Sequence, residues 1–275
     1  MKRFCFPPLF ILIFILSCNP KKEKSSVGVA LEIETFISLI EHDFEILEQE
    51  ILKIEKVVIE LFENKDDVLA SADKSKYKIE DTFANAAPNA DPNLSTLYIP
   101  TTGKDKKAVE EMIYLTNPLD EIFRKVIKEN EVITQVYFNS SIQFNRLYPP
   151  YDARTMLDPD LDVTSYNFYY KADEKNNPSR GLVWVEEIYI DPVGKGWVLS
   201  LLNPIYFEEQ LKMVLGFDIS INAILENYLS KTSRQLVIID QTGTVVAGRP
   251  KAIEALSLPP LKNHTYLQTI TLDSF

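Results

Sequence analysis

The chain is poor in the residue types on which metal sites, disulfide frameworks and phosphate-binding loops depend. It has two histidines, two cysteines and eight glycines among 275 residues. Zinc sites and disulfide scaffolds need more Cys and His than this, and no stretch has the glycine spacing of a phosphate-binding loop. Basic residues are also few, 29 against 40 acidic ones, and the formal charge of −11 disfavours nucleic-acid binding. The sequence therefore predicts no metal site, no cofactor and no nucleic-acid partner.

Catalytic constellations are missing as well. His42 lies in a predicted helix and His264 lies near the C-terminus, and neither has a nucleophile pattern beside it. The acidic run 158–162 lacks the glycine and the distal glutamate of a calcium loop, so we interpret it as a solvated loop. Hydrophobic residues still make up 45% of the chain, which is ordinary for a globular protein. We predict a folded protein that is not an enzyme.

The N-terminus has the pattern of a bacterial lipoprotein signal peptide, residues 1–17. Lys2 and Arg3 precede an apolar run, 9–16, which ends at Ser17 and Cys18. Eight residues are too few for a membrane span, which needs ~20, but they suit a secretory signal. We predict that Cys18 is lipidated and that the protein is extracytoplasmic and membrane-anchored, on the periplasmic side or the cell surface. The alternatives are an ordinary signal peptide or a short uncleaved anchor.

A polar tether, 18–26, leads to a long stretch, 27–72, with a heptad repeat. Its apolar positions step alternately by four and three residues: Ile33, Ile37, Ile40, Phe44, Leu47, Ile51, Ile54, Val58 and Leu61. A period of 3.5 residues predicts a long helix. This helix either packs on its own domain or pairs with a second copy to give a homodimer through 33–61.

The rest of the chain changes from helical to strand-like patterns. Residues 84–100 hold three prolines and predict a long loop, and 105–130 predict a helix interrupted at Pro118 with Asn117 as a cap. From residue 131 alternation predicts strands. The predicted strands are 132–138 with 141–145, 182–190 with 196–202, 212–219, 235–240 with 244–247, and 265–272; a short helix is expected at 221–229. Helices first and antiparallel hairpins later predict an α+β fold.

Four motifs in the strand region carry a resemblance to a known family. They are Val136-Tyr137-Phe138 with Arg146-Leu147-Tyr148-Pro149, Tyr189-Ile190-Asp191 with the glycines and the stretch 199–206 after it, Gly216-Phe217-Asp218-Ile219, and the hairpin 236–246. In this order the chain resembles the extracytoplasmic double Cache (dCache) sensor domains of bacterial chemoreceptors and sensor kinases. The resemblance implies a long N-terminal helix, a PAS-like antiparallel sheet as the membrane-distal lobe (73–230), and a short, incomplete membrane-proximal lobe (231–275).

The resemblance also implies a ligand site. Members that bind amino acids use an R-x-W-Y segment for the ligand carboxylate, then a Y-x-D, and the Asp of G-x-D for the amine. The matching positions here are Tyr166, Phe168, Tyr169, Tyr189, Asp191 and Asp218. Tyr166 stands where the family has arginine, so the bidentate carboxylate clamp is missing there.

Two carboxylates among aromatic rings favour a cationic ligand, either an amine, a quaternary ammonium or an amino-acid-like compound. The alternative for the tyrosines is that they fill the sheet face, and for Asp218 that it bonds backbone at a strand end.

The function implied by the resemblance is non-catalytic sensing of a small molecule outside the cytoplasm. Signal transduction then needs the heptad helix to act on a dimer mate or on a separate membrane signalling partner, because no second apolar span follows the strands. One alternative is a structural or assembly lipoprotein that uses the same fold and helix for protein–protein contacts. Another is that the chain is a truncated receptor.

The lipidation of Cys18 is testable by substitution. Cys18→Ser should prevent processing and move the protein from the membrane fraction to the soluble fraction, because a stable anchor needs the acyl chains. Cell fractionation and the mass of the mature N-terminus measure this, with Cys5→Ser as the matched control that should behave like wild type. A Cys18→Ser protein that is processed and membrane-attached like wild type would contradict the prediction.

Overall fold

The computed structural model describes residues 26–185, 189–190, 197–220, 223, 237–239, 245–248 and 251. The chain divides into two compact units, one of residues 47–220 and one that combines 1–46 with 221–275. The predicted signal peptide, Cys18, the short helix at 221–229 and the strand at 265–272 fall outside the described residues. Within the described part, no helix is long and apolar enough to cross a membrane.

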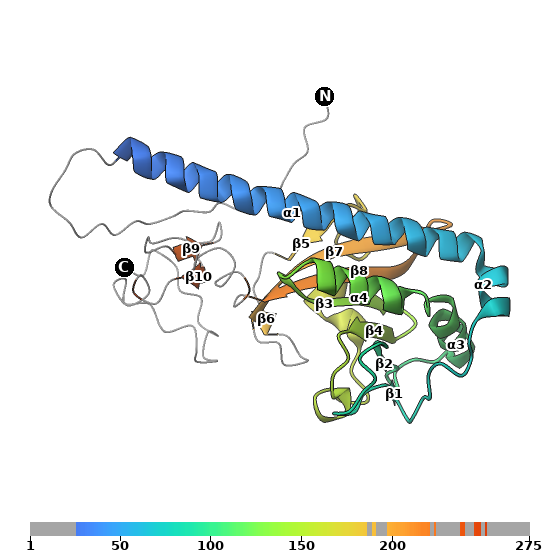
Figure 1. Cartoon of the computed structure of the whole chain (residues 1–275). Helices are drawn as coiled ribbons and strands as arrows, with labels where there is room; N and C mark the ends of the chain where they lie inside the picture. The colour runs from blue at the N-terminus through green and yellow to red at the C-terminus, as the bar shows by residue number, and fades with distance from the viewer. Residues whose placement is uncertain are drawn as a thin grey trace. The chain divides into compact units, whose positions relative to one another are not determined.

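An antiparallel sheet of eight strands forms the centre of the 47–220 unit (Figure 1). Its order is β1-β2-β4-β3-β8-β7-β5, with β6 also paired to β7. The strands are β1 Phe83–Ala84, β2 Thr96–Tyr98, β3 Ile133–Ser140, β4 Phe144–Tyr148, β5 Val183–Trp184, β6 Tyr189–Ile190, β7 Trp197–Phe207 and β8 Gln210–Ser220. The long strands β3, β7 and β8 lie side by side, and the predicted α+β fold with an antiparallel sheet is confirmed.

The strands β7 and β8 form one hairpin with a very short turn. Glu208 and Glu209, the two turn residues, both have positive φ, 50° and 62°. Two-residue turns of this hand match the right-handed twist of the strands that they join. The turn sets the register of the pairs Phe207–Gln210 and Tyr206–Leu211, and a register shift between Ile205 and Tyr206 then brings Ser200 opposite Asp218.

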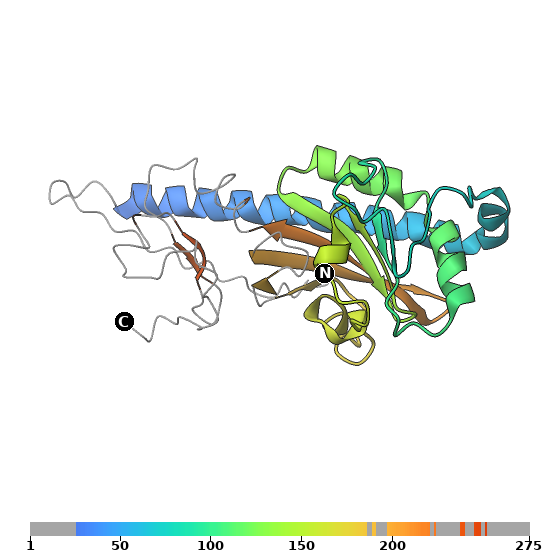
Figure 2. The same cartoon turned by 90° about the horizontal axis from the view of Figure 1, so that it is seen from below.

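Helices cover one face of this sheet, which we call the helix face. These helices are α1 Ser26–Glu63, α3 Lys106–Leu115 and α4 Leu119–Glu129, and the short α2 Lys65–Ser71 packs against α3. The helix α5 Asn167–Tyr170 and the 3₁₀ turns η1 Ala153–Thr155 and η2 Val163–Ser165 belong to the segment on the opposite face of the sheet. From Leu47 onward, α1 runs along β7, where Glu55 accepts from Asn203 (3.0 Å) and Phe62 stacks on Phe207 (5.5 Å between ring centroids). The helix α4 lies on the same face, against β3 and β4 (Figure 2).

The heptad positions in the second half of α1 are core residues of their own unit. Leu47, Ile51, Ile54 and Val58 are each 2% exposed or less. Burial of such side chains stabilises the unit by roughly 1.5–3 kcal/mol each. Over residues 47–58 the heptad seam therefore packs on its own domain, which is one of the two predicted alternatives. A homodimer through the earlier part of the 33–61 segment stays a prediction.

The predicted helix over 27–72 is interrupted once. It consists of α1 and α2, separated at Asn64, whose side-chain amide donates to the carbonyl oxygen of Glu60 (2.8 Å). Asparagine competes for backbone groups in this way and so favours helix ends. Its place outside the apolar seam explains why the heptad pattern did not predict the break.

Two other predictions need correction. The interruption at Pro118 is confirmed, since α3 ends before it and α4 begins after it. Asn117, however, is not the N-cap of α4. Its side-chain oxygen accepts from Arg146 (3.4 Å), and its side-chain amide donates to the carbonyl oxygen of Asp73 (3.3 Å). The predicted loop 84–100 contains β2, which pairs with β4. Its residues Thr96–Tyr98 are all buried, and the tertiary pairing outweighs the loop-like composition of the flanks.

In the other unit, β9 Val237–Ile239 pairs with β10 Val245–Gly248 in antiparallel fashion. This confirms the pairing of the predicted strands 235–240 and 244–247. The pairing has a register shift between Val245 and Ala247.

A buried ion pair joins the helix face of the sheet to α4. Arg146 of β4 is 0% exposed and donates to Asp120 of α4 (2.6 Å) and to the carbonyl of Ile113. Asp120 also accepts from Tyr77 and from the Ser95 hydroxyl (2.6 Å), and Lys76 approaches its second oxygen at 2.7 Å. Burial alone would raise the pKa of the Asp120 carboxyl, but Arg146 and then Lys76 hold it below its ordinary value.

Breaking this pair should be strongly destabilising. Arg146→Met leaves the Asp120 carboxylate buried without its main partner, and we expect a loss of about 3–5 kcal/mol in the free energy of unfolding. Because the folded pKa of Asp120 is lowered, its contribution is present above a pH of about 4 and is lost as the pH falls through the folded value. Urea unfolding at several pH values measures both effects. A loss below about 1 kcal/mol would contradict the prediction.

Candidate functional site

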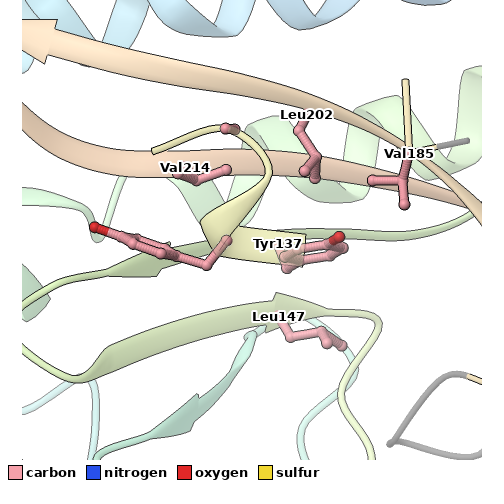
Figure 3. Close-up of a cluster of buried hydrophobic side chains, with 7 residues drawn as sticks. Tyr137, Leu147, Val185, Leu202 and Val214 are labelled. Carbon is pink, nitrogen blue, oxygen red and sulfur yellow. The ribbon is translucent and has the colours of Figure 1, made fainter. Parts of the chain in front are cut away.

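The face of the sheet opposite the helices is covered by one long segment, residues 151–185, and we call it the loop face. Side chains alternate along a strand, so Leu147 lies on this face whereas Arg146 lies on the other. The loop face carries a buried apolar cluster in which Leu202 and Val214 come from neighbouring strands (Figure 3). The cluster consists of Tyr137, Leu147, Leu202 and Val214 from the sheet and Tyr169, Ala172 and Val185 from the covering segment or its end.

A buried carboxylate lies beside this cluster. Asp218 of β8 is 2% exposed. One of its oxygens accepts from the Tyr137 hydroxyl (3.0 Å) and the Ser200 hydroxyl (2.5 Å), and the other accepts from the side-chain amide of Gln135 (3.3 Å). Gln135 and Ser200 lie opposite Asp218 on the two neighbouring strands. The central strands thus present a carboxylate held by neutral donors, the Asp218 cluster.

Gly216 makes room for this arrangement. It lies opposite Tyr137 in the ladder between β3 and β8. A Cβ atom at Gly216 would lie 2.4 Å from Cζ of Tyr137 and 2.6 Å from its hydroxyl oxygen. Only glycine therefore lets the tyrosine ring cross β8 and reach Asp218, two residues further along that strand.

Aromatic rings lead from the covering segment towards Tyr137. Phe168 meets Tyr137 edge to face, with ring centroids 6.2 Å apart, and stacks on Tyr166 at 5.1 Å. Tyr166 is 37% exposed, so the stack begins at the surface. Tyr169 is buried in the apolar cluster, and its burial raises the pKa of its hydroxyl to about 12.

The structure therefore brings four of the six predicted ligand-binding residues to one face: Tyr166, Phe168, Tyr169 and Asp218. The backbone of Tyr189 pairs with Val198, but its side chain and Asp191 lie outside the described residues. The contacts described for the Asp218 carboxylate are with three side chains.

Gln135, Tyr137, Ser200 and Gly216 were not predicted as site residues. The position of Ser200 depends on the register shift between Ile205 and Tyr206, because the two-residue turn alone would place Ser200 opposite Phe217. The positions of Gln135 and Gly216 depend on the pairing of β3 with β8, which are distant in the sequence.

The covering segment uses its two arginines elsewhere. Arg154 pairs with Glu80 (2.6 Å), and Arg180 pairs with Glu209 (2.8 Å) and lies over the ring of Tyr206. Neither arginine therefore replaces the family's arginine, which would bind a ligand carboxylate at the position of Tyr166. In the run 158–162, Asp162 accepts from the backbone of Thr164, and the part of the chain that the structure describes holds no group of three or more residues that could bind a metal ion.

The solved structures similar to this chain are ligand-binding sensory domains of chemoreceptors. The domain of Campylobacter jejuni Tlp3 with L-norvaline has a TM-score of 0.42 at 16% identity, over 90% of this chain and 79% of that domain. The Pseudomonas fluorescens CtaA domain with L-serine has a TM-score of 0.40 at 17% identity, over 52% of this chain. The match covers 63% of the CtaA domain, which is less than two thirds of its length.

No protein-family model and no curated protein matches the chain. The resemblance predicted from the motifs names the same kind of domain as these structures.

The packing of Tyr137 on Gly216 is testable with a matched pair of substitutions. Gly216→Ala should push the tyrosine ring away from Asp218 and lower the free energy of unfolding by about 1–3 kcal/mol. Gly181→Ala is the control, because the nearest atom to a Cβ there is the Ser179 hydroxyl at an ordinary 3.7 Å. Equal stability of the two variants in urea unfolding would show that the ring does not depend on Gly216.

Proposed function

We propose that this chain is a non-catalytic, extracytoplasmic sensory module that binds a small molecule carrying a protonated amine at the loop face, and that a lipid on Cys18 holds it at a membrane. The observation that supports the ligand site is the Asp218 cluster: a carboxylate 2% exposed, on the sheet face beneath a covering segment. Burying a carboxylate costs free energy, and a cationic group bound next to it would offset that cost.

The surroundings described for Asp218 suit this assignment. Its carboxylate accepts from Tyr137, Ser200 and Gln135, and Phe168 meets Tyr137 edge to face. A carboxylate with aromatic faces around it suits an amine through Coulomb attraction and cation–π contact.

The contacts of β5 offer a route from this face to α1. Val183 and Val185 pack against the apolar cluster of the loop face. The side chain between them points to the other face, where Trp184 Nε1 donates to Glu48 of α1 (2.8 Å). A ligand that shifts the covering segment would thereby act on α1, which we propose carries the signal to a second copy or a membrane partner.

A thermal-shift screen tests the binding function. The compounds should include primary amines, quaternary ammonium ions and amino acids, the class named as ligands of the similar Tlp3 and CtaA domains. A ligand at 100 times its Kd adds about 2.7 kcal/mol of stability. Asp218→Asn should lower the affinity for any cationic hit at least tenfold, whereas Asp162→Asn, on the covering segment, should leave it unchanged.

If no compound stabilises the wild-type protein, the sensory function fails and the assembly lipoprotein becomes the better account. If a compound binds equally well to the wild-type protein and to Asp218→Asn, the sensory function is supported, but the assignment of the ligand site to Asp218 is wrong.

A further inference from the structure

One polar atom next to the Asp218 carboxylate has no hydrogen-bond partner. Gln135 is 0% exposed, and its side-chain oxygen Oε1 has no donor within reach. The orientation of the amide follows from its neighbour, because the Asp218 carboxylate only accepts and so must face the Nε2 donor of Gln135. The oxygen is therefore the free end of the amide.

A buried acceptor without a donor is unusual, since the great majority of buried polar groups in native proteins are satisfied. Either an ordered water or a ligand atom would relieve it. Oε1 and Nε2 share one carbon atom, so Oε1 lies close to the carboxylate that Nε2 contacts. A negative charge and an acceptor in need of a hydrogen thus lie side by side on the loop face.

We propose that Gln135 is the residue that selects an N–H-bearing cation at this site: its Oε1 accepts a hydrogen bond from the ligand's ammonium group while Asp218 supplies the charge. This deepens the proposed function and rests on it. A primary or secondary ammonium satisfies both groups. A quaternary ammonium is attracted to the carboxylate by its charge but has no N–H, so it leaves Oε1 buried and without a hydrogen bond.

Sites that hydrogen-bond a substrate group discriminate strongly against analogues that lack it, because the buried partner is left unpaired. The site should therefore bind a primary amine at least tenfold more tightly than its trimethylated analogue. This distinguishes hydrogen bonding through Gln135 from cation–π contact alone, which tolerates methylation.

The test uses two matched probe pairs with the full mature chain: 2-phenylethylamine and L-alanine, each against its N,N,N-trimethyl derivative. Thermal shift and calorimetry should show a preference of at least tenfold for one or both primary amines in the wild-type protein. Gln135→Met removes the amide at similar volume and should abolish this preference. Its melting temperature without ligand should fall, because the Asp218 carboxylate loses the hydrogen bond from Nε2.

Two further variants control for structural effects. Gln135→Asn keeps an uncharged amide with both an acceptor and a donor and should keep a preference for the primary amine, which covers the case in which Gln135→Met fails to fold. Thr134→Val removes a hydrogen bond to the backbone carbonyl of Asp218 (3.0 Å), not to its carboxylate. It should lower the melting temperature and leave the preference intact.

Three results would overturn the proposal. Equal binding of the trimethyl derivatives would do so while leaving the sensory function standing. A lower melting temperature of Gln135→Met with an unchanged preference would assign Gln135 a structural role, with its oxygen satisfied by an ordered water. Failure of all four probes, with another compound in the broader screen binding in an Asp218-dependent way, would reject the amine class and keep the site.

Discussion

The ion pair between Asp120 and Arg146 is the constraint on which the rest of the 47–220 unit depends. A guanidinium with no exposure to water is costly to bury unless its charge is paired and most of its N–H groups are bonded. Arg146 donates to Asp120 of α4, to the carbonyl oxygen of Ile113 in α3 and to Tyr77 from the stretch before β1, while its Nε has no hydrogen-bond partner among the described residues. These contacts tie segments far apart in the chain to β4, which lies between β2 and β3 in the sheet.

The sheet separates two buried carboxylates that differ in environment. On the helix face, Asp120 is matched by cations and belongs to the framework. On the loop face, Asp218 is held by hydroxyl and amide donors beside an acceptor that lacks a donor. Within the described part of the chain, each cluster also holds a buried atom without a hydrogen bond, Nε of Arg146 on the helix face and Oε1 of Gln135 on the loop face.

Local patterns predicted much of this fold, and contacts between distant residues account for the rest. The heptad spacing predicted α1, and alternation predicted β3, β7 and β8, because burial of one face leaves a period in the sequence. The strand β2, which lies between β1 and β4, was missed because its three residues are too few to show a period. Asp218 was found from its motif, but Gln135 was not, since its role depends on the pairing of β3 with β8.

The β7–β8 hairpin carries contacts on both of its faces. Its strands pair from Val198–Ser220 to Phe207–Gln210, with one register shift between Ile205 and Tyr206. Ser200 and Asp218 meet on one face of the hairpin, and Asn203 and Phe207, nearer the turn, contact α1 on the other. One pair of strands therefore joins the buried carboxylate to the long helix.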